Sequence, residues 1–210
     1  MLDELHVTHP KLIPEVRLHV ARDAIILWAR LEAEAGSPTG PPFWASAWAG
    51  GQALARYLLD HPEVVAGKRV LDLASGSGLA AIAASLAGAA AVTANDIDPY
   101  AAAAIRANAR LNGVGVSILP EDILHVGGDH PMLGDFDVVM TGDGLYDRRL
   151  AADMLRFLRR ASRCGAQVLV GDPDRGHLPH ADLRLLETYP IVDTELADAE
   201  ITTTSVFRLT

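Results

Sequence analysis

The sequence is poor in residue types whose scarcity excludes whole classes of protein. Its single cysteine, Cys164, cannot form a disulfide within the chain, which excludes a disulfide scaffold and suits a reducing compartment. Lysine occurs only at Lys11 and Lys68, and the formal net charge is -9. Because nucleic-acid binding requires a basic surface, this charge disfavours a nucleic-acid partner.

Long apolar runs are also missing. Half of the residues are hydrophobic, but no uninterrupted apolar stretch reaches the length of a membrane span. The first residues include Asp3 and Glu4 and no apolar segment, so we expect no secretory signal. Alanine and arginine are abundant, as in proteins of GC-rich bacteria. We therefore expect a cytoplasmic, bacterial, monomeric protein without a membrane partner.

One stretch, from Arg69 to Leu79, organises the rest of the chain. Val70, Leu71 and Leu73 predict a short buried strand, and the alanine-rich run that begins at Leu79 predicts a helix. The residues between them, 75–78, read Ser-Gly-Ser-Gly and predict a tight turn, because glycine adopts dihedral angles that other residues avoid. A strand, a glycine turn and a helix open a nucleotide-binding βα unit.

Two cofactors fit this turn. Gly76, Gly78 and Ala81 match the dinucleotide pattern G-x-G-x-x-G/A, and Asp96 follows at a distance suited to a ribose. However, a dinucleotide would place its pyrophosphate beside the carboxylate of Asp72, and two like charges repel in a partly dry site. S-adenosylmethionine carries a sulfonium and an ammonium instead, so Asp72 favours this methyl donor.

The remaining pattern predicts one doubly wound α/β domain of five βα units, with a mostly parallel seven-stranded sheet and an antiparallel final strand. Residues 1–40 are predicted as an irregular end and a helical extension over 14–35, and residues 41–210 as the catalytic domain. The expected strands are residues 70–73, 91–95, 116–119, 136–140, 166–170, 189–195 and 202–209, and the expected helices are 53–59, 79–87, 100–111, 148–161 and 179–187.

Acids follow several of these strands. In a parallel sheet ligands bind at the carboxyl ends of the strands, so Asp96 is expected to bond ribose hydroxyls and Asp122 or Glu121, with Asp122 favoured, to meet the adenine. Asp98 and Asp147 fit the role of helix N-caps. Asp143 follows another strand, with Tyr146 three residues later, and this pair is the candidate for the transfer chemistry; a capping turn is the alternative.

Two further segments carry candidate contacts. Trp44 and Trp48 lie four residues apart and form either core packing or, as the adjacent glycines at 50 and 51 favour, an aromatic wall beside a sulfonium. Asp172 and Arg175 belong to a loop at the same sheet edge and are candidates for substrate binding, although turn chemistry alone also explains the loop. His125 and His130 have no companions at metal-ligand spacing, so we expect surface histidines and no metal.

These residues together resemble a known family. The order Asp72-x-Ala74-x-Gly76-x-Gly78, Asp96, Asp122 and Asp143-x-x-Tyr146 resembles the class I, seven-β-strand methyltransferases. The segment from Pro42 through Trp44 and Trp48 to Asp60 is similar to lysine methyltransferases of the family 16 type. The likeness covers most of residues 14–210. The double-tryptophan segment with Asp143-x-x-Tyr146 is specific, whereas the glycine turn alone is not.

The resemblance implies a protein-lysine N-methyltransferase. Its cofactor would be S-adenosyl-L-methionine, with S-adenosyl-L-homocysteine as product, and its acceptor the electron transfer flavoprotein β-subunit. A ribosomal protein, a small amine or a non-catalytic binding role are the alternatives. The cofactor-binding residues would be Trp44, Trp48, Asp72, Ala74, Ser75, Gly76, Gly78, Asp96, Ile97, Asp122 and Ile123, and the catalytic residues Asp143 and Tyr146.

The sequence departs from the family pattern at four positions. Ala74 stands where glycine is commoner, Ser77 where cysteine is frequent and Ala49 where proline is usual. These three changes are expected to leave cofactor binding intact. Gly144 stands where a larger residue is usual and is expected to widen or loosen the acceptor mouth, which bears on the identity of the substrate.

Overall fold

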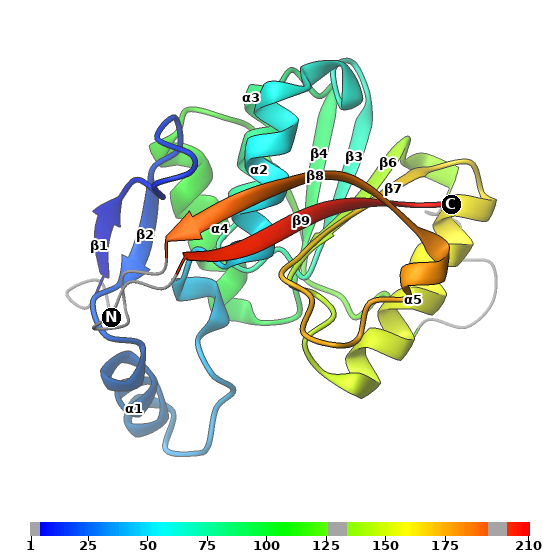
Figure 1. Cartoon of the computed structure of the whole chain (residues 1–210). Helices are drawn as coiled ribbons and strands as arrows, with labels where there is room; N and C mark the ends of the chain where they lie inside the picture. The colour runs from blue at the N-terminus through cyan, green and yellow to red at the C-terminus, as the bar shows by residue number, and fades with distance from the viewer. Residues whose placement is uncertain (1–4, 126–133, 193–200) are drawn as a thin grey trace.

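A computed structural model describes residues 5–125, 134–192 and 201–210. Seven strands form one sheet in the order β5-β4-β3-β6-β7-β9-β8 (Figure 1). Strands β3 to β7 are parallel, β9 is antiparallel to β7, and β8 is antiparallel to β9. This arrangement confirms the predicted mostly parallel sheet with an antiparallel end. The strands are β3 (Arg69–Leu73), β4 (Ala91–Asn95), β5 (Ser117–Leu119), β6 (Val138–Gly142), β7 (Gln167–Asp172), β8 (Leu183–Val192) and β9 (Ile201–Leu209).

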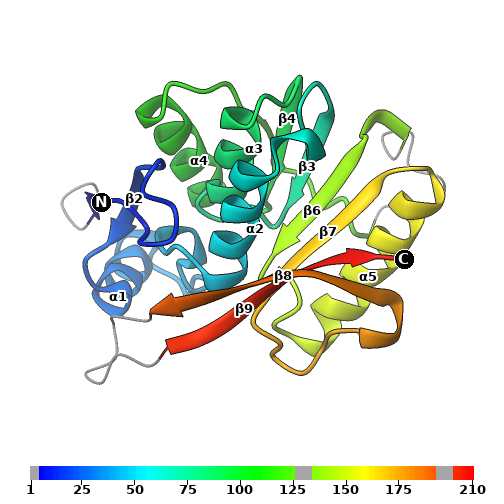
Figure 2. The ribbon, with the colours of Figure 1, turned by 45° about the horizontal axis from the view of Figure 1, so that its top comes forward.

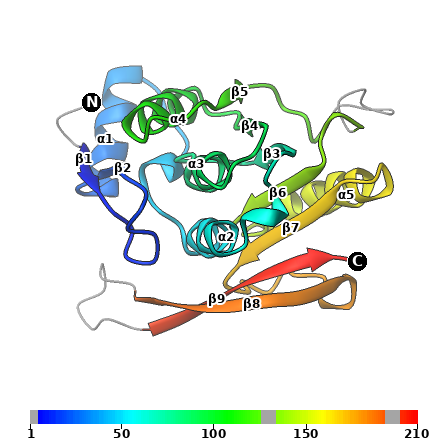
Figure 3. The same cartoon turned by 90° about the horizontal axis from the view of Figure 1, so that it is seen from above.

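Helices cover both faces of the sheet. Helices α2 (Ala49–Asp60), α3 (Leu79–Leu86) and α4 (Pro99–Leu111) lie on one face, and α5 (Arg148–Arg163) lies on the other (Figure 3). The side chains that join α2 to α4 to the sheet include Leu54, Ala81 and Ile105, whereas Met154 and Leu158 of α5 pack on the opposite face. Burial of these two apolar layers provides the main driving force for folding.

Capping side chains determine where helices α4 and α5 begin. Asp98 caps α4 by accepting a 2.8 Å hydrogen bond from the backbone N–H of Tyr100, and Pro99 occupies the first helical position. Asp147 caps α5 by accepting from the N–H groups of Arg149 and Leu150. Both N-cap predictions are confirmed. No helix in the described part of the chain has the length and apolar character needed to span a bilayer.

The N-terminal segment differs from the prediction. Strands β1 (Leu5–Thr8) and β2 (Leu18–Ala21) pair as an antiparallel hairpin, and helix α1 spans only Ala24–Ala35. The predicted helix over residues 14–35 is therefore wrong in its first half, and residues 5–8 are not irregular. Asp23 explains the late start, because its carboxylate accepts from the N–H groups of Ile25 and Ile26. The division of the chain at residue 40 stays a prediction.

The C-terminal hairpin brings a second correction. Residues 183–187, predicted as part of a helix, belong to β8, which pairs with β9 along its length. Figure 2 shows this hairpin beside β7, and α2 contacts both of its strands. Apolar spacing over five to eight residues does not separate a helix from a strand, and here the pairing with β9 decides. Within the described residues, β3, β4 and β6 are followed by α-helices, fewer than the five βα units predicted. Residues 193–195 of the expected strand and His130 lie outside the described residues.

Candidate active site

The parallel strands end at one edge of the sheet, where the main cavity lies. It has a volume of about 720 Å³. Its walls come from the segment before α2, the glycine turn after β3 and the loops that follow β4, β5, β6 and β7. Among the predicted site residues it is lined by Trp44, Trp48, Ala74, Gly76, Asp96, Ile97, Asp122, Asp143, Tyr146 and Arg175. The structure therefore brings together most of the residues that the sequence singled out.

The glycine turn is tied to the acid after the neighbouring strand. The backbone N–H of Gly76, whose φ is +56°, donates a 2.8 Å hydrogen bond to Oδ2 of Asp96, and the N–H of Asp98 donates to Oδ1 at 3.0 Å. Burial raises the pKa of the Asp96 carboxyl above its ordinary value, against these hydrogen bonds. Asp96 is thus oriented at the carboxyl end of β4, facing the cavity.

Asp72 lies deeper than the sequence suggested. Its carboxylate is 1% exposed and accepts hydrogen bonds from the hydroxyl of Ser75 at 2.6 Å and from the N–H of Ala81 at 3.1 Å. Burial raises the pKa of Asp72 to about 7. Asp72 and Ser75 line a small second cavity beside the turn rather than the main one. Asp72 therefore holds the turn and does not line the main cavity.

Three other residues of the predicted set lie away from the main cavity. Gly78 caps α3 with φ +81°, and a Cβ there would come within 3.3 Å of the Ile105 side chain. Ile123 is buried in the core beneath α5. Asp172 is 1% exposed at the end of β7. Ala74 does line the cavity and has φ +51°, a left-handed conformation that explains why glycine is the commoner residue at this turn.

Asp143 is held by three donors from two directions. Its Oδ2 accepts from the backbone N–H groups of Gly50 and Gly51 at the start of α2, the second at 3.1 Å. Its Oδ1 accepts from Nη2 of Arg175 at 2.8 Å. The carboxylate is 8% exposed, and the backbone of Asp143 has φ +57°. A strained, buried and fully oriented acid at a strand end is typical of a functional site.

Glycine at position 50 makes the contact between α2 and the strand ends possible. A Cβ on Gly50 would lie 2.1 Å from the carbonyl oxygen of Gly171 and 2.7 Å from Oδ2 of Asp143. Gly51 is different, since a Cβ there would meet nothing within 4 Å. The close approach of backbone to backbone, rather than flexibility, is the reason for Gly50.

Three aromatic rings in mutual contact form part of the cavity wall. The ring of Phe43 lies edge-on to Trp48 at 5.6 Å and to Tyr146 at 5.4 Å between centroids. Trp48 is 40% exposed and donates from Nε1 to the carbonyl of Phe43 at 2.7 Å, and Cζ of Arg175 lies 5.8 Å from the Trp48 ring. Trp44, by contrast, is 2% exposed and stacks on Tyr100. Trp44 therefore belongs to the core as well as to the cavity lining, and Trp48 forms part of the exposed cavity wall.

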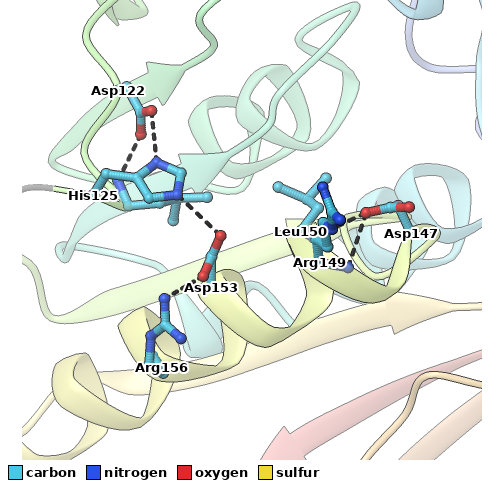
Figure 4. A network of polar contacts seen from close by, with 8 residues as sticks. Asp122, His125, Asp147, Arg149, Leu150, Asp153 and Arg156 are labelled. Carbon is cyan, nitrogen blue, oxygen red and sulfur yellow. Dashed lines mark hydrogen bonds and ion pairs between the residues drawn. The ribbon is translucent and has the colours of Figure 1, made fainter.

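Asp122 also lines the cavity, and its carboxylate is held by His125. Figure 4 shows His125 between two acids: Nδ1 lies 2.7 Å from Oδ2 of Asp122, and Nε2 lies 2.9 Å from Oδ2 of Asp153 on α5. Asp153 also pairs with Arg156. The hydrogen bonds to Asp122 and Asp153 raise the pKa of His125, and His125 in turn lowers the pKa of Asp122. His125 is exposed, as expected, but it joins the loop after β5 to α5.

Gly144 does not widen the cavity, contrary to the prediction. The residue is buried and does not line the cavity, and a Cβ there would lie 2.2 Å from Oγ1 of Thr141 and 3.2 Å from Cε of Met154. Thr141 and Met154 fill the space that a larger residue would occupy.

Sequence reasoning missed part of the cavity wall. Phe43 adjoins the tryptophan segment, so the sequence pattern could have indicated it. Asp98 was assigned from the sequence only to capping a helix. The missed lining residues are Gly40, Pro41, Phe43, Leu73, Asn95, Asp98, Ala101, Leu124, His125, Gly142, Leu150 and Met154. In the described part of the chain no group of three or more His, Cys, Asp or Glu residues is arranged to hold a metal ion.

Solved structures share the fold. The tRNA (uracil-54, C5)-methyltransferase of Pyrococcus abyssi in complex with S-adenosyl-L-homocysteine superposes with a TM-score of 0.57 at 16% identity, covering 99% of this chain and 44% of that one. TrmN from Thermus thermophilus gives a TM-score of 0.52 at 24% identity, covering 74% of this chain and 48% of that one. At these identities the likeness concerns the fold alone.

Sequence comparisons are more specific. The family model for ribosomal protein L11 methyltransferase (PrmA) matches residues 52–142. The electron transfer flavoprotein beta subunit lysine methyltransferase of Rattus norvegicus is 40% identical over 200 residues, covering 92% of this chain and 76% of the relative. The Homo sapiens protein of that name is 39% identical over 203 residues, covering 93% and 75%. The chain therefore belongs to the family of electron transfer flavoprotein beta subunit lysine methyltransferases.

Proposed function

We propose that this chain transfers a methyl group from S-adenosylmethionine to a lysine ε-amine of the electron transfer flavoprotein β-subunit. The observation that carries the proposal is that Asp96, Asp143, Tyr146 and Trp48 line the same cavity. The names of the most similar relatives supply the acceptor. The same relatives remove the support for a dinucleotide cofactor, because they are methyltransferases.

The residues present fit the methyl donor. Asp96 offers a carboxylate to ribose hydroxyls, and its own orientation is already set by Gly76 and Asp98. Ala74 and Gly76 bring the backbone of the turn to the cavity wall, where the methionine end would lie. Asp122 would face the adenine. We include Ser75, Gly78, Ile97 and Ile123 as supports of this surface. When bound, S-adenosylmethionine supplies an electrophilic methyl group on a sulfonium.

The chain's own contribution is to place a neutral amine. A lysine is an ammonium in water, with an ordinary pKa of about 10.4, and only its free amine has a lone pair to attack with. Asp143 would accept a hydrogen bond from that amine and so fix the direction of the lone pair. Tyr146, Phe43 and Trp48 would wall the lysine stem and exclude water. The proton of the lysine ammonium would leave before transfer, and the neutral amine, on taking the methyl group in place of sulfur, would become a methylated ammonium. Orientation of this kind provides a large part of the rate enhancement in two-substrate reactions.

A second acceptor has specific support. The PrmA family model matches part of this chain, and the ribosomal protein L11 methyltransferase of Symbiobacterium thermophilum is 49% identical over 55 residues, covering 26% of this chain and 18% of that protein. The matched region holds the cofactor turn, which differs little between methyltransferases. We therefore rank a ribosomal protein second. We keep a reducing compartment, the cytoplasm, as part of the proposal because the sequence has one cysteine.

The test is an unbiased search for the acceptor. The purified chain is incubated with S-adenosylmethionine carrying a labelled methyl group and a lysate of cells that lack this gene, and the labelled molecules are identified by mass spectrometry. Label on a lysine of the flavoprotein β-subunit supports the proposal. Label on a ribosomal protein alone keeps the chemistry and replaces the acceptor. Label on small amines alone, or binding of cofactor without any label, overturns protein methylation.

A further inference from the structure

Arg175 occupies an unexpected place, because a cation already sits where the reactive amine should bind. Its Nη2 donates to Oδ1 of Asp143 at 2.8 Å, and its Cζ lies 5.8 Å from the ring of Trp48. The side chain is 38% exposed, whereas that of Asp143 is 8% exposed. The proposed function gives Asp143 one nitrogen partner, the amine of the substrate lysine, but the structure gives it another, the guanidinium of Arg175.

The backbone keeps Arg175 in this place. Its N–H donates to Oδ1 of Asp172 at 3.3 Å, next to the 2.7 Å hydrogen bond from the N–H of Asp174 to the same oxygen. Asp172 is buried at the end of β7, so the loop begins from a rigid point. Arg175 is therefore anchored at its backbone by one acid and at its guanidinium by another.

One acceptor position on Asp143 is left for a substrate. Oδ2 is used by the N-terminus of α2, but a carboxylate oxygen accepts two hydrogen bonds, so Oδ1 can accept one more beside Arg175. Two nitrogen atoms that are each hydrogen-bonded to one oxygen lie within about 6 Å of each other. An ammonium at this position would face the guanidinium at that range, and a neutral amine would not.

The other ionisable groups around the cavity do not cancel this repulsion. The carboxylate of Asp172 is engaged by the backbone N–H groups of Asp174 and Arg175, and that of Asp96 by those of Gly76 and Asp98. Burial raises the pKa of both carboxyls and of the Tyr146 phenol. On the loop of Arg175, Asp174 is paired with His180, and both side chains are about half exposed and screened by water. Asp143 and Arg175 thus form a neutral pair.

We propose, on the basis of the proposed function, that Arg175 is a positioning residue that makes the cavity select the acceptor lysine as its free amine. The guanidinium holds the Asp143 carboxylate in a fixed orientation, so that Oδ1 accepts an N–H of the amine, and the charge of the guanidinium disfavours the ammonium form. The proton that the lysine carries in water leaves to solvent when the lysine binds, before methyl transfer.

An alternative role for the contact between Arg175 and Asp143 predicts the opposite effect of removing Arg175. If Arg175 were a stand-in for the substrate, the lysine ammonium would displace it from Asp143 and bind with its proton. Removal of Arg175 would then strengthen acceptor binding and raise turnover at neutral pH. The number of protons released when the acceptor binds distinguishes these two roles of Arg175.

The experiment measures proton release by isothermal titration calorimetry. The full chain, loaded with unreactive S-adenosyl-L-homocysteine, is titrated with purified flavoprotein β-subunit in two buffers of different ionisation enthalpy, at several pH values from 7 to 10. Wild type is compared with Arg175→Gln, with Arg175→Lys, which keeps a cation, and with Arg163→Gln, an exposed arginine at the far end of α5. Turnover at saturating acceptor is followed over the same pH range.

Wild type, Arg175→Lys and Arg163→Gln are expected to release a proton on binding, with the same pH midpoint. In Arg175→Gln the midpoint moves upward by about one pH unit, as expected for a like charge removed from within 4–6 Å, and turnover at neutral pH falls about tenfold but recovers in alkali. Equal midpoints in all variants overturn the inference, as does a gain in activity for Arg175→Gln. Absence of binding to wild type instead overturns the proposed acceptor, and the inference with it.

Discussion

Asp96 accepts a 2.8 Å hydrogen bond from the backbone N–H of Gly76, so the acid after β4 and the glycine turn after β3 form one rigid unit. The two segments are twenty residues apart in the sequence and adjacent in the sheet through the pairing of β3 with β4. This contact orients the carboxylate before any ligand arrives. Preorganisation of this kind lowers the cost of binding.

Asp96→Ala is expected to weaken binding of S-adenosyl-L-homocysteine by about ten- to a hundredfold, since a hydrogen bond to a charged group contributes about 1.5–3 kcal/mol. Calorimetric titration of the cofactor product measures the change. The control is Asp137→Asn, whose carboxylate pairs with Arg69 at the opposite edge of the sheet and which should bind normally. Equal affinity of Asp96→Ala and wild type would contradict the ribose assignment.

Asp143→Asn is expected to keep cofactor affinity within about twofold and to lose most turnover, by a factor of about a hundred or more. An amide oxygen can still accept from the N-terminus of α2, but it no longer carries the charge that pairs with Arg175. Single-turnover methylation assays give the rate, and calorimetry gives the affinity. Asp174→Asn, on the neighbouring loop and 47% exposed at the side chain, is the matched control. Unchanged kinetics in Asp143→Asn would remove Asp143 from the mechanism.

Gly50→Ala and Gly51→Ala form a pair that differs only in the space available. Alanine at position 50 would overlap the carbonyl of Gly171, so we expect a loss of about 1–3 kcal/mol in the free energy of unfolding. Alanine at position 51 meets nothing and replaces a glycine in the first turn of α2, so we expect a gain of up to about 0.5–1 kcal/mol. Urea denaturation measures both. Similar values for the two variants would show that α2 does not approach β7 as described.

The His125 bridge predicts a pH-dependent contribution to stability. The pKa of His125 is raised in the folded protein by Asp122 and Asp153, so its contribution is fully present below about pH 6.5 and is lost as pH rises through the higher folded value. We therefore expect the melting temperature of His125→Gln to lie furthest below that of wild type near pH 5.5, and the difference to shrink towards pH 8.5. A difference that stays constant over this range would mean that the bridge does not depend on the charge of His125.

The sequence could predict those structural features that depend on residues close together in the chain or on a general rule of sheet topology. Asp98 and Asp147 were identifiable as N-caps because capping depends on residues two or three positions away. The positions of Asp96 and Asp143 followed from the rule that ligands bind at the carboxyl ends of parallel strands.

What sequence could not supply depends on partners distant in the chain. Residues 183–187 form a strand because β9 lies beside them. The space beside Gly144 is filled by the side chains of Thr141 and Met154. The pairing of Arg175 with Asp143 joins two loops whose distance only the fold sets. Asp72 carried the right sign of charge for the cofactor, but its burial beneath Ser75 and Ala81 was not visible in the pattern.

The most direct test of the central claim is methylation of a purified acceptor. Wild type and Asp143→Asn are incubated separately with labelled S-adenosylmethionine and purified electron transfer flavoprotein β-subunit, and the labelled residue is located by peptide mass spectrometry. The account predicts label on a lysine side chain with wild type and about a hundredfold less with Asp143→Asn. No label with a wild-type protein that binds the cofactor, or label on a residue other than lysine, would contradict it.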